Sequence, residues 1–170
     1  MLITETPRLI LRRLTWNDLD DLATLYADPD VMTFLGGTLT YEATKQHLEW
    51  IFNSYEKHGF GLWATIHKAD NRFIGRCGLI ALEIDGQQEV EIGYALAKKY
   101  WGQGLATEAA RAIRDYAFCE LGYSRLISLV DHGNIASQKV ATKNGLIYEK
   151  NTTKWNKNLR VYVRQLADIF

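Results

Sequence analysis

Two glycines at the entrance of an amphipathic helix constrain the fold of this chain most. Gly102 and Gly104 stand between an extended segment that ends near Leu96 and a helical pattern over residues 105–121. Glycine loses more conformational freedom on folding than other residues, so the pair indicates a turn with positive φ or a close approach to the backbone. A helix N-terminus carries unpaired N–H groups and partial positive charge, which suit a phosphate. The turn alone is also compatible with a purely structural role.

The surrounding periodicities predict one domain over residues 1–170, since no repeat, low-complexity tract or linker divides the chain. Strands are expected at 8–14, 61–67, 73–83, 89–96, 125–130, 147–155 and 159–166. Helices are expected within 15–28, 40–59, 105–121 and 135–144. The turn pairs Asp70-Asn71 and Asp85-Gly86 indicate an antiparallel meander in the middle of the chain. The order predicts an α+β fold, a mixed sheet with helices on its faces.

Composition narrows the class of function. Lys+Arg and Asp+Glu are both 20, so the formal net charge is zero, which argues against generic binding to nucleic acid or a membrane surface. No apolar run approaches the ~20 residues of a membrane span, and the start does not resemble a signal peptide. We therefore expect a cytoplasmic protein. Cys77 and Cys119 lack metal-ligand spacing, the four histidines form no metal pattern, and both thiols are expected to be buried and reduced.

Three kinds of phosphate-binding turn compete for the glycine pair. A nucleoside-triphosphate loop requires Lys and Ser or Thr after its last glycine, whereas Leu105 and Ala106 follow here. A dinucleotide fingerprint requires a small residue where Thr107 stands, and too little chain remains after the turn for a doubly wound sheet. The third kind is the pyrophosphate loop of acetyl-coenzyme A-dependent N-acetyltransferases.

Three ordered motifs resemble the GNAT superfamily of N-acetyltransferases over nearly the whole chain. The family loop reads Gln/Arg-x-x-Gly-x-Gly/Ala, and here it is "WGQGLA" at residues 101–106. The wider string "EIGYALAKKYWGQGLATEA", with "TPRLILR" at 6–12 and "NIASQKVATKNGL" at 134–146, looks like the RimJ/RimL-like branch, which acetylates N-termini of ribosomal proteins. Tryptophan is usual in that branch where Trp101 departs from the family pattern, and Leu146 replaces its Phe.

The resemblance implies a GNAT fold with acetyl-CoA as cosubstrate. That fold has a central mixed, mostly antiparallel sheet of about seven strands, splayed between the fourth and fifth, with about four flanking helices. Backbone N–H groups of the glycine loop would cradle the pyrophosphate. The preceding strand would pair with pantetheine, and one of its N–H groups would polarise the thioester carbonyl. The implied cofactor-binding residues are Tyr94, Ala95, Leu96, Trp101, Gly102, Gln103, Gly104, Leu105, Ala106, Thr107, Asn134 and Ser137.

Acetyl transfer to an amine requires a neutral nucleophile, and most amines are protonated at pH 7. Successive side chains of a strand point to opposite faces, so in the strand "EVEIGYAL" Glu89 and Glu91 lie on one face. Val90, Ile92 and Tyr94 lie on the other. Both carboxylates could also lie on a solvated face. The resemblance favours Glu91 as the base, acting through a water, because the branch has an acidic residue just before its Ile-Gly-Tyr.

The leaving thiolate needs a proton, and many GNAT enzymes supply it from a tyrosine. Ala141 stands at that position here, so Ser137 is the substitute that the family motif suggests, although it could simply bond local backbone. Asn134 suits the N-cap of the same helix and would also contact the cofactor. Glu108, in the first turn of the preceding helix, is expected to be structural.

The segment "VMTFLGG" at residues 31–37 lies between the first two helices, where the family builds its acceptor cleft, and Phe34 is the expected substrate contact. We therefore expect an N-acetyltransferase that moves an acetyl group from acetyl-CoA to a primary amine in a ternary complex. The alternative is a non-catalytic acyl-CoA-binding or interaction module with the same fold. The acceptor stays open among a protein N-terminus, a polyamine, an aminoglycoside and an amino-acid-like amine, and so does the choice between monomer and homodimer. No metal, nucleic acid or membrane is expected to take part.

Overall fold

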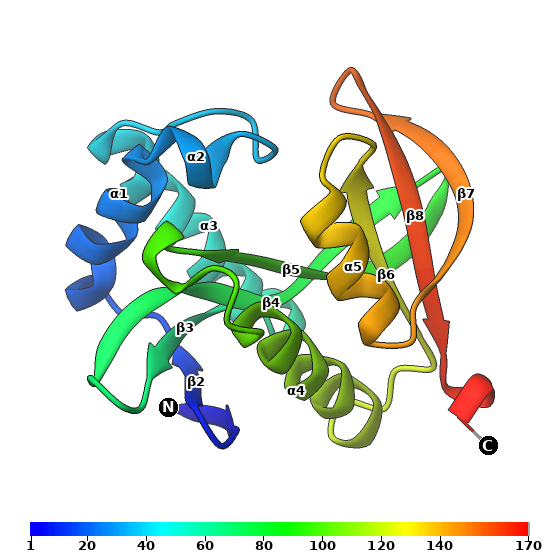
Figure 1. The fold of residues 1–170 in the computed structure, drawn as a ribbon, viewed down its shortest axis with the longest axis horizontal. Helices are drawn as coiled ribbons and strands as arrows, with labels where there is room; N and C mark the ends of the chain where they lie inside the picture. Colours follow the sequence, from blue (N-terminus) through cyan, green and yellow to red (C-terminus); the bar gives the residue numbers. More distant parts are fainter. Residues whose placement is uncertain (170) are drawn as a thin grey trace.

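The computed structural model describes residues 1–169, with side chains through residue 167, and builds them around one eight-stranded sheet. The strands are β1 (Leu2–Glu5), β2 (Leu9–Arg13), β3 (Leu62–His67), β4 (Arg72–Ile84), β5 (Gln87–Leu96), β6 (Arg125–Asp131), β7 (Ile147–Lys154) and β8 (Lys157–Gln165). The helices are α1 (Leu19–Ala27), α2 (Pro29–Met32), α3 (Tyr41–His58), α4 (Leu105–Cys119) and α5 (Ile135–Lys143). The spatial order of the strands is β1-β2-β3-β4-β5-β6-β8-β7 (Figure 1).

The expected α+β architecture is confirmed, with two additions. An eighth strand, β1, pairs with β2 at the sheet edge, and its four residues are too short to give a periodic signal. A fifth helix, α2, is a single turn with Pro29 in its first turn and the Asp28 side chain accepting from the N–H of Asp30. The last hairpin turns at Trp155 and Asn156, whose φ angles are 50° and 58°, so β8 begins earlier than expected.

The sheet is splayed where its parallel pair of strands, β5 and β6, meets. Strands β4 and β5 align at ten positions, whereas β5 and β6 align at one, Glu91 with Ile127. These are the fourth and fifth of the strands expected from the sequence, so the expected position of the splay is confirmed. Figure 1 shows β5 and β6 diverging, with α5 packed beside β6. The carboxyl-terminal half of β5 is therefore left without a strand partner on one edge.

Helices cover the two faces of the first half of the sheet differently. Helices α1 and α3 pack together, and Tyr26 of α1 reaches Arg76 of β4. Helix α4 contacts β4 and β5 from the other face, where the ring of Tyr116 meets that of Trp63 edge-on, 5.5 Å between centroids. Trp63 is fully buried in this main core. Since successive side chains of β5 alternate between these faces, the two sides of the splay are lined by different residues of β5.

Candidate active site

The glycine turn presents a row of unpartnered N–H groups at the start of α4. Gly102 and Gly104 have φ angles of 71° and 77°, which strongly favour glycine. None of the N–H groups from residue 102 to residue 107 has a hydrogen-bond acceptor among the described residues. A Cβ built on Gly102 would meet no atom within 4 Å, so the space before the turn is open. These donors and the positive end of the α4 dipole make a cradle that is suited to an anion, and we call it the anion cradle.

The segment that precedes β2 braces this turn. Glu108 Oε1 accepts hydrogen bonds from Thr6 Oγ1 at 2.6 Å and from Arg8 N at 3.0 Å. Glu108 Oε2 accepts from Arg8 Nε at 2.7 Å, and Arg8 Nη1 donates to the carbonyl of Gln103 at 2.8 Å. Glu108 thus has the structural role expected of it. Sequence reasoning missed Arg8, which fixes the turn from a hundred residues away.

A groove of about 780 Å³ begins at this turn and follows α4 away from the splay. Gly104 and Thr107 line one end and Cys119 the other. Cys119 is exposed, which corrects the expectation of two buried thiols, because it lies on the outer face of the last turn of α4. Both thiols are free, as expected. The groove adjoins the anion cradle but lies apart from the candidate acid and base.

The backbone of β5 turns toward the splay at alternate residues. The carbonyl of Ala95 points at Gly75 of β4, while the carbonyl of Ile92 accepts from Ser128 Oγ of β6 at 3.5 Å. By alternation, the N–H groups of Tyr94 and Leu96 face the splay, beyond the last alignment with β6. Of the three residues expected to pair with pantetheine, Tyr94 and Leu96 therefore present backbone groups to the splay, whereas Ala95 presents its own to β4.

Trp101 and Gln103 make contacts that hold the loop. Trp101 Nε1 donates to the carbonyl of Leu96 at 2.7 Å, which ties the loop to the end of β5. Gln103 Nε2 donates to the carbonyl of Lys99 at 3.3 Å. Leu105 is buried under the loop, and Ala106 and Thr107 are partly exposed in the first turn of α4. Contacts of these residues with a cofactor remain predictions.

Glu91 lies where β5 and β6 part. Its Oε1 accepts from the N–H of Leu129 on β6 at 3.4 Å. Burial raises the pKa of Glu91 to about 7, although this hydrogen bond and the positive charges of Arg76 and Lys154 oppose the shift. A carboxylate with this pKa is half ionised near neutral pH and can both accept and release a proton. Tyr94, three residues along the strand, projects from the opposite face.

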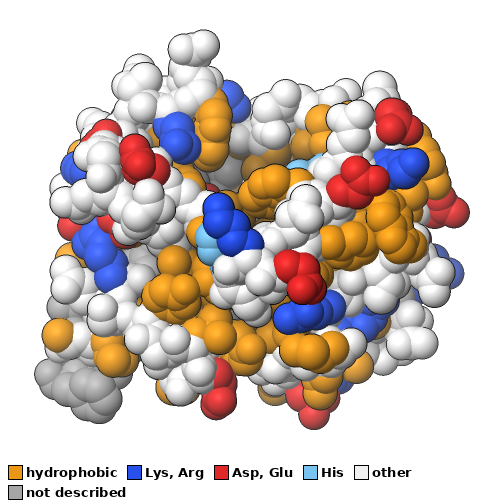
Figure 2. Space-filling view, turned by 180° about the vertical axis from the view of Figure 1, so that it is seen from behind, with side chains coloured by type: hydrophobic (Ala, Val, Ile, Leu, Met, Phe, Trp, Pro, Cys, Tyr) orange, Lys and Arg blue, Asp and Glu red, His pale blue; other side chains and the backbone are white. Residues whose placement is uncertain are grey.

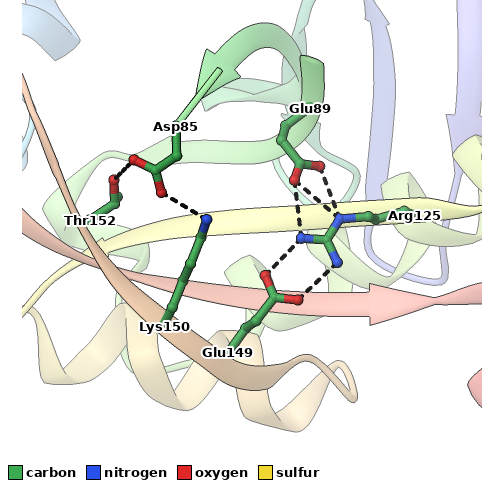
Figure 3. Close-up of polar contacts among 6 residues, drawn as sticks. All are labelled: Asp85, Glu89, Arg125, Glu149, Lys150 and Thr152. Carbon is green, nitrogen blue, oxygen red and sulfur yellow. Dashed lines mark hydrogen bonds and ion pairs between the residues drawn. The ribbon is translucent and has the colours of Figure 1, made fainter. Parts of the chain in front are cut away.

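Glu89, the other carboxylate on the same face, is fully engaged elsewhere. Its two oxygens accept from the guanidinium of Arg125 at 3.0–3.1 Å, and Glu149 binds the same guanidinium from β7 at 2.7 Å (Figure 3). Beside this cluster, Asp85 accepts from Lys150 and Thr152. The cluster lies at the closed end of the splay, where it joins the two halves of the sheet. Both oxygens of Glu89 are thus held by Arg125, which makes Glu89 a less suitable candidate base than Glu91.

Ser137 faces a tyrosine that sequence reasoning assigned only a backbone role. Ser137 Oγ and Tyr94 Oη lie 2.6 Å apart, so the two hydroxyls share a hydrogen bond between α5 and β5. Burial raises the pKa of Tyr94. Asn134 caps α5 as expected, its Oδ1 accepting from the N–H of Ser137 at 3.1 Å. Ala141 is buried in a small core beneath α5 and carries no proton donor.

Phe34 reaches across the open end of the splay. A Cβ built on Gly133, in the turn between β6 and α5, would lie 3.4 Å from Cε1 of Phe34. The ring is partly exposed, and the neighbouring His132 is exposed. The face opposite to that of Figure 1 is hollowed between the two halves of the molecule, with apolar side chains around the hollow (Figure 2). These contacts agree with an acceptor cleft in this region.

The described residues contain no cluster of three or more His, Cys, Asp or Glu side chains placed to hold a metal ion. No helix within residues 1–169 is both long and apolar enough to cross a membrane.

Comparison with known proteins identifies the family. Residues 8–147 match the model of the acetyltransferase (GNAT) domain. The chain belongs to the GNAT acetyltransferase family. It is 40% identical over 141 residues to the uncharacterized protein YkkB of Bacillus subtilis, covering 83% of this chain and 82% of that protein. It is 30% identical over 147 residues to the uncharacterized N-acetyltransferase p20 of Bacillus licheniformis, covering 85% and 81%.

A solved acetyltransferase structure has the same fold at low identity. The ribosomal alpha-N-protein acetyltransferase RimL, in complex with coenzyme A, superposes with a TM-score of 0.81 and 18% identity, covering 97% of this chain and 98% of that one. At this identity the similarity establishes the shared fold. The RimJ/RimL-like branch suggested by the motifs remains a prediction.

Proposed function

We propose that this GNAT protein transfers an acetyl group from acetyl-CoA to a primary amine by direct attack in a ternary complex. The observation that carries the proposal is the run of free N–H groups at residues 102–107, in a loop that Trp101 ties to the end of β5, next to the unpaired edge of that strand. A diphosphate fits the N–H groups of the turn, and an extended chain with amide groups, such as pantetheine, fits the unpaired edge of β5. No metal is needed, because the helix dipole and backbone donors offset the phosphate charge.

The chain's own residues would hold acetyl-CoA at both ends of this path. The turn at Gly102 and Gly104 would bind the pyrophosphate, and the N–H groups of Tyr94 and Leu96 would pair with pantetheine. Acetyl-CoA supplies an activated thioester that is susceptible to attack by an amine. One N–H of β5 would donate to the thioester oxygen as negative charge develops there.

Proton transfer would occur on opposite faces of β5. Glu91, directly or through a water, would take the proton that the amine must lose. The amine nitrogen would form its new bond to the carbonyl carbon while the C–S bond breaks. The Ser137 hydroxyl, hydrogen-bonded to Tyr94, would give a proton to the departing sulfur. A base with a pKa near neutrality is well suited to this role.

The test measures binding and turnover separately. Calorimetry with acetyl-CoA reports the cofactor site, and release of free CoA thiol reports transfer to a panel of amines that includes peptides and small molecules. We expect binding and amine-dependent thiol release. Binding without release for every amine would instead support a non-catalytic acyl-CoA-binding module, an alternative that the alanine at residue 141 favours.

A further inference from the structure

Arg76 is a buried arginine without an acidic partner. It lies in β4 and is only 7% exposed. Its Nε donates to Tyr26 Oη at 3.0 Å, and no carboxylate among the described side chains forms an ion pair with it. Buried guanidinium groups are normally paired, because removing an unpaired charge from water is costly. An unpaired buried arginine therefore points to a ligand that supplies the missing anion.

The guanidinium lies over the face of β5 that carries Glu91. The residues beside it are small and leave space around it. Ala64 and Ala95 are its cross-strand neighbours. A Cβ built on Gly93 would lie 3.8 Å from Arg76 Nη1, so the guanidinium extends over β5 two residues from Glu91. The two terminal nitrogens have no protein partner within the described chain, yet they are not sealed from solvent. They remain open to a group that enters the cleft.

Two aromatic groups near Arg76 in the structure, Tyr26 and His47, carry no negative charge to pair with it. Tyr26 of α1 contributes a hydroxyl and a ring, whose centroid lies 5.7 Å from the guanidinium carbon. Burial lowers the pKa of His47 of α3 to about 4, and the charge of Arg76 acts in the same direction, so this imidazole is neutral at pH 7. The charge of Arg76 also reaches Glu91, an acidic group on the same face of the sheet. Glu91 is the proposed base and must exchange protons freely.

We propose that Arg76 binds a carboxylate of the acceptor, so that the acceptor is a small amino-acid-like amine. The inference rests on the proposed function and specifies its acceptor. Gly93 and Glu91 are separated by about 6.6 Å along the strand. A carboxylate on Arg76 and an amine facing Glu91 would thus belong to one molecule, a few bonds apart. Arginine binds carboxylates with two parallel hydrogen bonds, which fixes the orientation of the amine.

The test compares each common amino acid with its own amide in the thiol-release assay. We expect the acid to be used at least about 30-fold better in kcat/KM, the effect of one lost charge-assisted contact. In Arg76→Gln the preference should disappear, so that the acid and its amide are used with nearly equal kcat/KM, and this ratio does not depend on how far the lost charge changes both rates through Glu91. Arg76→Lys should recover part of the preference. Equal use of acids and amides by the unaltered protein, or better use of peptide N-termini, would overturn the proposal.

Two further measurements separate this proposal from the proposed function. Calorimetry with acetyl-CoA shows whether Arg76→Gln still folds and binds the cosubstrate. Titration of amino acids and their amides into the CoA-bound protein reports acceptor binding without turnover. If no amine reacts but acids bind and amides do not, the carboxylate site stands and the transferase proposal fails. If thiol is released with amines while acids and amides bind alike, the transferase stands and the carboxylate site is wrong.

Discussion

The hydroxyl oxygens of Tyr94 and Ser137 lie 2.6 Å apart, and the bond between them joins β5 to α5 across the splay. Glu91 lies on the other face of β5, three residues before Tyr94. A reacting thioester held along this strand would thus have a basic group on one side and hydroxyls on the other. This arrangement separates the acceptor side from the leaving-group side.

Replacing Ser137 by alanine is expected to lower kcat by about 10- to 100-fold, because a thiolate leaves fairly well without a general acid. The affinity for acetyl-CoA should change little. Tyr94→Phe should have a smaller effect in the same direction, because it removes only the partner of Ser137. Steady-state kinetics with a competent acceptor, together with calorimetry, measures both. Unchanged turnover in Ser137→Ala would leave Ser137 as a local structural hydroxyl.

Replacing Glu91 by glutamine keeps its size and removes the base. At pH 7 we expect kcat/KM to fall about 100-fold, within the range of general base catalysis. Since the pKa of Glu91 is about 7, the unaltered enzyme should gain activity as pH rises through neutrality. Much of the deficit should be recovered in alkaline solution, where the amine deprotonates unaided. A pH–rate profile of both forms tests this, and a constant deficit would assign Glu91 to substrate positioning.

The same carboxyl should also affect stability, with a defined sign. Its folded pKa of about 7 lies above the unfolded value of about 4.3, so the unfolded chain ionises first as pH rises. The unaltered protein therefore loses stability between about pH 4 and 7, and the loss stays constant above that. Glu91→Gln avoids it and should be more stable at pH 8 by up to a few kcal/mol, but not at pH 4. Urea denaturation of both proteins at the two pH values tests this prediction. A gain in stability of Glu91→Gln that does not depend on pH would contradict the raised pKa of Glu91.

Local patterns in the sequence predict most of the fold and the position of the glycine turn to which we assign the cofactor. The glycine turn, the Asn134 cap and the alternation along β5 are short-range features, and each depends on backbone geometry that the residue types favour. The missed elements, β1 and α2, have four residues each, which is too short for a periodic signal.

The catalytic half depends on contacts between residues far apart in the chain. Alternation placed Glu89 and Glu91 on one face and could not separate them. Arg125, 36 residues from Glu89, binds that carboxylate, while the opening of the splay leaves Glu91 with a single backbone donor. Arg76 did carry a signal, a lone charge inside the apolar run "FIGRCGLIAL", but only packing shows that no carboxylate among the described side chains pairs with it.

The glycine cradle can be tested with a matched pair of variants. Gly104→Val places a branched side chain at positive φ within the cradle, with its Cβ 3.6 Å from Arg8 Nη2, and we expect CoA binding to weaken by at least about 2 kcal/mol. Gly122 has a similar φ of 72° but follows the other end of α4, so Gly122→Val reproduces the backbone strain away from the cradle. Calorimetry should show the loss only in Gly104→Val. Equal affinities in the two variants would remove the pyrophosphate assignment.

The ion cluster at the closed end of the splay should dominate the stability of the junction. The side chain of Arg125 is 28% exposed and that of Glu89 only 7%, so Arg125→Met would leave Glu89 buried without a counterion. We expect a loss of about 3 kcal/mol or more in the free energy of unfolding. The double variant Arg125→Met with Glu89→Met should recover much of it, since neither charge remains buried.

Lys150→Met provides the control for this prediction, because its ion pair with Asp85 lies beside the Arg125 cluster but is exposed on both sides. Exposed ion pairs contribute about 1 kcal/mol or less, so the free energy of unfolding of this variant should be close to that of the unaltered protein. Urea denaturation of all four proteins gives the comparison. If Arg125→Met and Lys150→Met cost the same, the Glu89–Arg125 pair does not hold the halves of the sheet together, and the position of Glu91 at the splay must depend on the apolar packing of β5 and β6.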